Sequence, residues 1–173
     1  AYAGIGSRNT AEAGSGISGG SGPWSYSIAA SAYRTGGFNI AADPVRYRIA
    51  NGAVPRDDAD GYRNNSLVGR LGYRFAPGHE LQAHLLEATS NNSVDSGGVN
   101  VDAYNRDKSR VFGLHLRNRL GDGWNSTLRL GLGEDNSSNF APARTQFATQ
   151  QKQLTWQHDI RVGAGSLMLA LEN

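Results

Sequence analysis

The feature that most constrains the fold of this chain is a two-residue alternation of apolar and polar side chains. In the segment LVGRLGYRF, Leu67, Leu71 and Tyr73 fall on one side of an extended chain. Arg70 and Arg74 fall on the other side. The same alternation recurs in WSYSIAA (24–30), FGLHLR (112–117), WNSTLRLGL (124–132) and LTWQHDIRV (154–162). This period is typical of β-strands with one apolar and one polar face, so we expect an all-β chain.

Composition favours strands over helices. The chain has 173 residues, of which 23 are glycine and 38% are hydrophobic, a mixture that suits strands and turns better than a helical core. No stretch approaches the roughly 20 apolar residues that a membrane-spanning helix needs. The first residues, AYAGIGSRNT, lack the charged and apolar regions of a signal peptide. If the chain crosses a membrane, we expect it to do so as strands.

Charge and side-chain chemistry exclude several classes of function. The net charge is +2, with 17 basic and 15 acidic residues spread along the chain, so no nucleic-acid partner is expected. The absence of cysteine excludes disulfides, thiol catalysis and thiolate metal sites. The serines lack a nucleophile elbow, and the glycine-rich GSGISGGSG (14–22) precedes no helix that would make it a phosphate loop. We therefore expect no enzyme.

The alternation predicts about nine strands, each about as long as a tilted membrane strand. They lie near residues 1–7, 11–20, 24–35, 62–75, 80–90, 108–120, 124–134, 148–162 and 166–172. Tight turns are expected at 21–23, 76–79, 121–123 and 163–165, and long polar loops near 36–62, 90–107 and 134–149. Short turns at one end and long loops at the other are typical of outer-membrane β-barrels.

Aromatic residues gather at the strand ends next to the short turns. Trp24 and Trp124 directly follow such turns, and Tyr73 and Phe75 directly precede one. Rings at a common strand end form the interfacial girdle of a membrane barrel, although aromatic residues are also good strand formers in general. A bacterial single-chain barrel usually closes with an even number of strands, and an open sheet would leave two edges that lipid cannot satisfy. We therefore expect the chain to be a piece of a larger barrel.

With these features the chain resembles the barrel of TonB-dependent outer-membrane receptors, most of all the cobalamin (vitamin B12) transporter branch. The resemblance rests on SYSIAASAYRTGGFNIAAD, PRDDADGYRNNSLVGRLGYRF, GHELQAHLLEA, LRNRLGDGWNSTLRLGLGEDNSSN and QLTWQHDIRVGAGSLMLALEN. It implies that residues 1–173 form the first part of an antiparallel transmembrane β-barrel of the 22-stranded type. The plug domain and the later strands of such a receptor are missing from the sequence.

The resemblance also implies a function. It is the active transport of cobalamin or another metal chelate across the outer membrane of a Gram-negative cell. This chain would supply barrel wall and external loops, in contact with outer-membrane lipid and the solute, while the plug would contact TonB. Two alternatives remain open: a soluble extracellular β-sandwich that acts as an adhesin, and a passive pore built from several chains.

Carboxylates crowd the stretch PRDDADGY (55–62). Asp58 and Asp60 are two positions apart, so both side chains can point the same way from an extended segment. A bound Ca²⁺, which takes six to eight oxygen ligands, would relieve their repulsion. A solvated acidic loop accounts for the same residues equally well.

The resemblance to calcium-binding cobalamin transporters implies which residues would hold the metal. Asp58 and Asp60 match an aspartate pair of the family, and Asp95 matches an aspartate of the next external loop. Asn39 stands where the family pattern has another aspartate. Its neutral amide lowers the charge of the site, so a reduced calcium affinity is expected. Asp102 is a further candidate at a position where the alignment is ambiguous.

Several arginines share the polar side of the expected strands: Arg70, Arg74, Arg117, Arg119, Arg129 and Arg161. In a barrel that side is the lumen, where arginines would pair with plug carboxylates or attract an anionic solute. A solvated sheet face explains each of them equally well. The four histidines lack metal-ligand spacing and are interpreted as surface or lumen residues.

Overall fold

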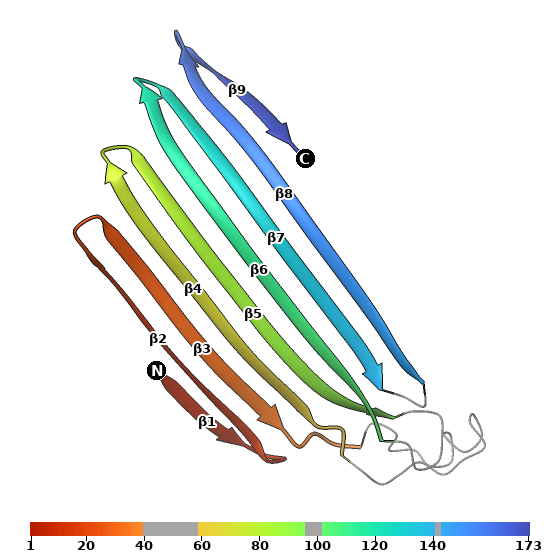
Figure 1. The fold of residues 1–173 in the computed structure, drawn as a ribbon. Helices are drawn as coiled ribbons and strands as arrows, with labels where there is room; N and C mark the ends of the chain where they lie inside the picture. Colours follow the sequence, from red (N-terminus) through yellow and green to blue (C-terminus); the bar gives the residue numbers. More distant parts are fainter. Residues whose placement is uncertain (40–58, 96–101, 141–142) are drawn as a thin grey trace.

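The computed structural model describes residues 1–39, 59–95, 102–140 and 143–173, which form one antiparallel β-sheet (Figure 1). The strands are β1 (Tyr2–Gly6), β2 (Thr10–Ser21), β3 (Trp24–Thr35), β4 (Tyr62–Ala76), β5 (His79–Asp95), β6 (Asp102–Gly121), β7 (Trp124–Phe140), β8 (Arg144–Val162) and β9 (Gly165–Glu172). The expected all-β chain with nine strands is confirmed. No helix in the described part of the chain is long and apolar enough to cross a membrane.

Each strand pairs with the strands that precede and follow it in the sequence. The order across the sheet is β1-β2-β3-β4-β5-β6-β7-β8-β9, so β1 and β9 are its two edges (Figure 1). The described strands therefore form an open sheet rather than a closed barrel. An open edge presents unpaired backbone N–H and C=O groups, which require water or another strand.

Short turns join the strands at one end of the sheet. They connect β2 to β3, β4 to β5, β6 to β7 and β8 to β9, as the sequence predicts. Each contains a glycine with positive φ, for example Gly78 at 81° and Gly123 at 79°. This left-handed conformation is accessible to glycine at little cost, and it allows a turn of a few residues. The strand ends joined by residues 7–9, 36–61, 96–101 and 141–143 lie at the opposite end of the sheet (Figure 1).

The long polar loops expected near 90–107 and 134–149 are wrong in extent. β5 continues to Asp95, β6 begins at Asp102, β7 continues to Phe140 and β8 begins at Arg144. Their polar composition hid these strand ends, because ladder pairing depends on backbone groups and not on apolar side chains. Asp107 illustrates how the polar ends are held, since it accepts hydrogen bonds from Ser90 at 3.1 Å and from Ser137 at 2.6 Å.

The sheet is a single layer with almost no core. Among the described residues Ala103 is the one buried hydrophobic residue, and no large side chain is fully buried. Leucines that would fill the core of a globular domain remain accessible, such as Leu130 at 43% and Leu171 at 64%. The apolar face of this sheet therefore lacks a covering layer among the described residues.

Strand register arranges the apolar side chains of one face in rows across the sheet. One row contains Trp24, Tyr73, Leu81, Leu116, Leu128, Trp156 and Leu171. The next contains Tyr26, Leu71, Ala83, Leu114, Leu130 and Leu154. A third contains Ile28, Gly69, Leu85, Phe112, Leu132 and Lys152. We call the apolar side chains of these rows, with the aromatic residues beside the short turns, the apolar band.

The aromatic pair Trp24–Tyr73 gives a test of this register. The two residues are directly opposite each other, and their ring centroids lie 4.3 Å apart. Contacts of this kind contribute about 0.5–1.5 kcal/mol beyond area burial, so we expect a coupling energy in that range. The measurement is a double-mutant cycle with Trp24→Ala and Tyr73→Ala in urea unfolding of the full-length protein. Additive effects of the two substitutions would contradict the register.

Candidate functional site

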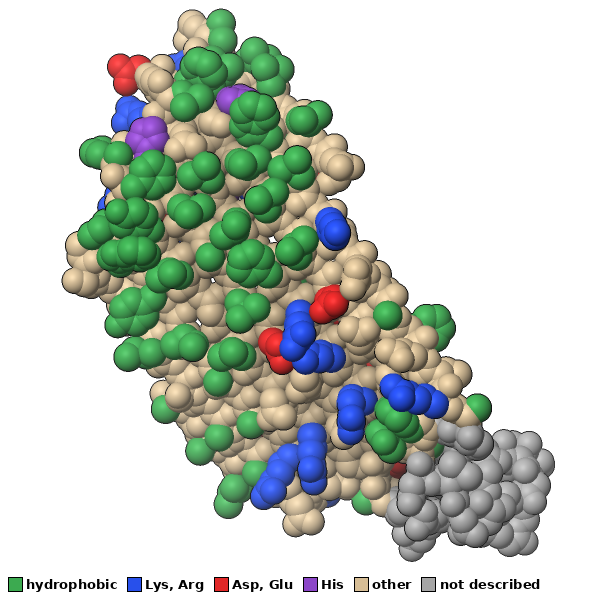
Figure 2. All heavy atoms as spheres, viewed as in Figure 1, with side chains coloured by type: hydrophobic (Ala, Val, Ile, Leu, Met, Phe, Trp, Pro, Cys, Tyr) green, Lys and Arg blue, Asp and Glu red, His purple; other side chains and the backbone are tan. Residues whose placement is uncertain are grey.

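The apolar band ends at a charged boundary on each strand from β3 to β8. Counted from the short turns, each of these strands runs for about ten residues, from 79–86 on β5 to 64–76 on β4, before the first charge on this face. Every second residue belongs to the face, and the stretch is about as long as a tilted transmembrane strand. The first charged residues are Arg34, Arg63, Glu87, Arg110, Glu134 and Lys152. Figure 2 shows this face, with hydrophobic side chains in the upper half and charged side chains below them.

The height of the band matches a lipid bilayer of modest thickness. Ten residues of a strand extend about 33 Å at roughly 3.3 Å per residue. With the strands tilted by about 40°, the band would be about 25 Å tall, which is the height of the apolar band of outer-membrane barrels. This agreement holds for the average stretch over β3 to β8, since the stretch is shortest on β5 (79–86) and longest on β4 (64–76).

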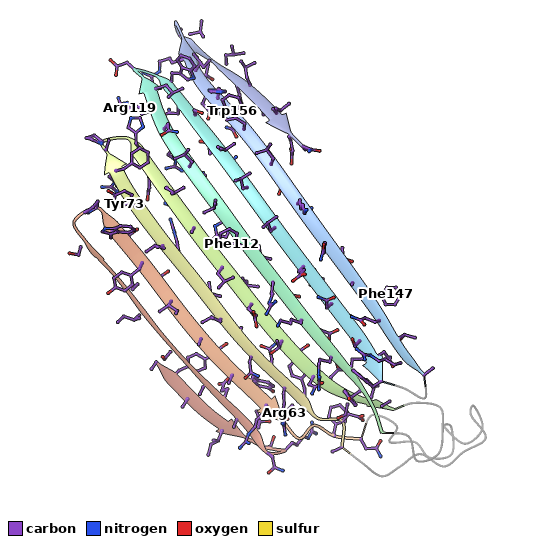
Figure 3. The ribbon with its side chains drawn as sticks, viewed as in Figure 1. Arg63, Tyr73, Phe112, Arg119, Phe147 and Trp156 are labelled. Carbon is purple, nitrogen blue, oxygen red and sulfur yellow. The ribbon has the colours of Figure 1, made fainter. Side chains whose placement is uncertain are left out.

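Aromatic side chains mark the other boundary of the band, next to the short turns. Tyr73 lies 6.4 Å from Phe75 between ring centroids, and Trp156 lies 4.8 Å from the ring of His158. The indole of Trp124 donates a hydrogen bond to Nδ1 of His158 at 3.1 Å. Figure 3 shows Tyr73 and Trp156 towards this end of the sheet. Such rings have an apolar body and a polar edge, which suits a boundary between an apolar phase and water.

The opposite face of the sheet is mainly polar, and we call it the polar face. Strand register places on it the arginines that the sequence assigns to that side: Arg70, Arg74, Arg117, Arg119, Arg129 and Arg161. Arg70 donates to the Gln82 amide oxygen at 2.7 Å, and the Gln82 amide in turn donates to Glu80 at 2.8 Å. These hydrogen bonds organise a hydrated surface without burying a charge.

The polar face has two features that suit contact with another body. A row of apolar side chains crosses it at Val68, Leu86 and Val111, which are 46%, 38% and 41% exposed. His115 lies on the same face, and its Nε2 is buried with no hydrogen-bond partner among the described residues. A packed domain or ordered water against this face would satisfy both features.

The structure brings two of the predicted metal ligands together at the loop end of the sheet. The Asp60 amide donates a hydrogen bond to the Phe38 carbonyl at 3.2 Å, which places Asn39 beside the segment that contains Asp60. Gly37 makes this approach possible, since it has a φ of 70° and a Cβ there would lie within 1.8 Å of the Asp60 carbonyl oxygen. Asn39 and Asp60 both have interaction partners in the structure.

The other predicted ligands are not brought into a complete site. Asp95 pairs with Asp102 at the end of the β5–β6 ladder, and neither side chain is among those described. Asp58 lies outside the described residues. No group of three or more His, Cys, Asp or Glu residues that could hold a metal occurs in residues 1–39, 59–95, 102–140 and 143–173. The calcium site therefore stays a prediction.

A set of basic residues on the apolar face was missed in the sequence analysis. Arg34, Arg63, Arg106, Arg110 and Arg144 share strand parity with the leucines, but they lie beyond the charged boundary or form it. The sequence contains the information that would place them on this face. Each arginine is an even number of positions from an apolar residue of its own strand, and such residues share a face. Arg106 and Arg144 were not recognised because the strand ends at 90–107 and 134–149 were interpreted as loops. Arg34, Arg63 and Arg110 lie within predicted strands, but their parity with the apolar residues was not considered.

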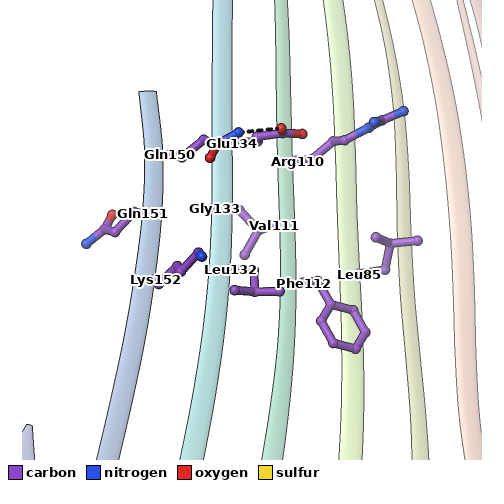
Figure 4. Close-up of a pocket in the computed structure, with 10 residues that line it drawn as sticks. All are labelled: Leu85, Arg110, Val111, Phe112, Leu132, Gly133, Glu134, Gln150, Gln151 and Lys152. Carbon is purple, nitrogen blue, oxygen red and sulfur yellow. Dashed lines mark hydrogen bonds between the residues drawn. The ribbon is translucent and has the colours of Figure 1, made fainter. Parts of the chain in front are cut away.

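A shallow hollow of about 320 Å³ lies where the apolar band meets the charged boundary (Figure 4). Leu85, Phe112 and Leu132 line its apolar side. Its other side is polar, with Glu134 accepting a hydrogen bond from the Gln150 amide at 3.2 Å. The hollow is open and lacks an enclosed set of reactive groups, so it suits an amphipathic molecule better than a chemical reaction.

Comparison with known proteins does not identify a family. No protein-family model matches the chain, and no curated protein matches it.

Calcium titration of the full-length protein tests the predicted metal site. We expect Asn39→Asp to raise the Ca²⁺ affinity, because it adds a carboxylate beside Asp60, and Asp60→Asn to lower it. The measurement is isothermal titration calorimetry. Asn136→Asp adds the same charge on β7, at a position paired with Lys108 and Ala148, and serves as the matched control. An affinity that neither change at the loop end alters would exclude Asn39 and Asp60 as ligands.

Proposed function

We propose that this chain forms part of the wall of an outer-membrane β-barrel that transports a scarce nutrient. One observation carries the proposal: the sheet is a single layer whose apolar band has a bilayer-like height and is bounded by aromatic rings at one end and charges at the other. An apolar surface of this extent requires a cover, and hydrocarbon chains of lipid provide one.

A soluble β-sandwich is supported less well by the same observation. In a sandwich, a second sheet covers the apolar face, and the core reaches along most of the paired strand length. Here β6 to β8 continue well beyond the band with polar side chains on both faces, as between Asp107 and Ser137 or between Lys108 and Asn136. Strands that emerge from an apolar layer into water have this composition.

The polar face would line the lumen of the barrel. The arginines and amides there would keep the interior hydrated and attract anionic groups of a solute. A plug domain within the lumen would cover the apolar row at Leu86 and supply a partner for His115. Additional strands would pair with β1 and β9, since an unpaired edge is costly in lipid.

The resemblance to TonB-dependent receptors supports a more specific version of this proposal. In that version the barrel is of the 22-stranded type, and the solute is cobalamin or another metal chelate. The plug and TonB would provide gating and energy, and this chain would contribute no catalytic group. The loop end with Asn39 and Asp60 would face the outside of the cell, where loops capture the solute.

Intact mass and heat-modifiable migration test the barrel proposal. We expect the polypeptide extracted from outer membranes in detergent to be several times larger than the 18.5 kDa of this chain. We also expect its gel mobility to change on boiling, because a closed barrel resists detergent until heated. A soluble species of 18.5 kDa without a mobility change would overturn the proposal.

Spin labels on neighbouring residues test which medium covers each face. Leu130 lies in the apolar band and Arg129 on the polar face, and the chain contains no cysteine that would react with the label. In the full-length protein, we expect a label at Leu130→Cys to be reached by oxygen, which concentrates in lipid. A label at Arg129→Cys should instead be reached by a water-soluble nickel complex. A Leu130→Cys label that neither reagent reaches would indicate burial under a second protein layer.

A further inference from the structure

We propose that Arg34 and Arg63 bind a phosphate group of an anionic lipid in the outer leaflet, a site that rests on the proposed membrane barrel. The two residues are directly opposite each other on β3 and β4. They are also the first charged residues beyond the apolar band on those strands. A lipid whose acyl chains cover the band would bring its headgroup to this level.

The position of the pair follows from strand parity. Arg34 is on the same face as Tyr26 and Ile28, and Arg63 is on the same face as Leu67 and Leu71. Both guanidinium groups therefore belong to the outer surface of the proposed barrel and not to its lumen. Ala32 and Asn65 separate them from the apolar band without adding charge. In Figure 3, Arg63 lies towards the loop end of the sheet.

Two like charges directly opposite each other destabilise a sheet, and an anion bound between two arginines would offset their repulsion. No ion pair of Arg34 or Arg63 is found with any described residue. Arg110 and Lys108 on the same face differ, because both contact Glu87, at 2.8 Å and 3.6 Å. Among the described residues, Glu87 thus neutralises Lys108 and Arg110. Arg34 and Arg63 have no such carboxylate among these residues and can bind an external anion.

The surface around the arginine pair has room for a ligand. A hollow of about 460 Å³ is lined by Ala11, Ala13, Ala32, Arg34, Arg63 and Asn65, with Glu12 and Tyr33 from the intervening positions. The alanines form a shallow floor between β2 and β4, because their side chains end at a methyl group. Planar guanidinium groups bind phosphate oxygens through two parallel hydrogen bonds, so two of them can hold one phosphate on both sides.

Neighbouring strands extend the positive charge along the same level. Tyr104 and Phe140 stack with ring centroids 4.4 Å apart, and Arg144 lies 5.0 Å from the Phe140 ring. Arg106 lies 5.9 Å from the same ring. Both guanidinium groups lie over this aromatic face, where a cation–π interaction is favourable. Basic side chains outnumber acidic ones on the lower part of this face in Figure 2, which complements a leaflet of phosphorylated lipids better than a neutral one.

Native mass spectrometry of the detergent-solubilised full-length protein tests the proposal. The probe is diphosphorylated lipid A, compared with the same lipid after removal of its phosphates. We expect the unmodified protein to retain the phosphorylated lipid, and the double variant Arg34→Gln and Arg63→Gln to bind it at least about tenfold more weakly. Higher salt should weaken binding to the unmodified protein, since the contact is electrostatic.

The matched control removes the same charge at the other end of the sheet. Arg119→Gln with Arg161→Gln changes two arginines of the polar face near the short turns, and it should leave lipid binding unchanged. Heat-modifiable migration of every variant shows whether the barrel has formed. Equal retention of the phosphorylated lipid by the unmodified protein and the Arg34/Arg63 variant, with normal migration, would overturn the lipid site alone.

Two further outcomes are distinguishable. Equal retention of the phosphorylated and the dephosphorylated lipid by the unmodified protein would show that acyl contacts, and not the arginines, hold the lipid, which would also overturn this site. Absence of heat-modifiable migration in the unmodified protein, together with a Leu130→Cys label that oxygen cannot reach, would instead overturn the membrane barrel itself.

Discussion

The backbone hydrogen-bond ladder between sequence neighbours is the constraint on which the rest of this structure depends. Each strand pairs with the preceding and the following one. The register of one strand pair therefore fixes which side chains of the third strand can lie in the same row. Side chains of opposite strands therefore form rows, such as the row from Trp24 to Leu171. A slip of one residue in any pair would transfer leucines to the polar face and arginines to the apolar face.

The same ladder explains why a chain with little core holds a defined shape. Its order comes from paired backbone groups and from side-chain contacts within each face, for example between Trp156 and Ser126 at 3.0 Å. It does not come from a packed interior, which a single layer cannot form. As a consequence the apolar band stays exposed, and no described residue covers it. Under the proposed function, lipid would cover the apolar band outside the barrel, and a plug domain would cover the polar face inside it.

Strand positions could be predicted well wherever one face is apolar. Trp24–Thr35 has the predicted bounds, and Gly165–Glu172 differs by one residue at its start, because alternation and turn glycines identify both. The prediction failed at 91–95 and 135–140, where polar residues predominate on both faces and the alternation of apolar and polar side chains is lost. Those missed strand ends also hid Arg106 and Arg144 as members of a basic row. The predicted calcium ligands were located only in part. The hydrogen bond from the Asp60 amide to the Phe38 carbonyl places Asn39 beside the segment with Asp60, and spacing in the sequence does not reveal this contact.

The sequence by itself determined the all-β class, the short turns and the separation of each strand into an apolar and a polar side, because these depend on local period and on glycine conformation. Only the tertiary structure decided which residues share a row, how far the polar strands extend, and that Arg34 lies directly opposite Arg63. Those properties depend on register between segments that are far apart in the chain. A tight turn fixes the register of its own hairpin, but the register of β3 with β4, which residues 36–61 connect, follows from pairing along the whole length of the two strands.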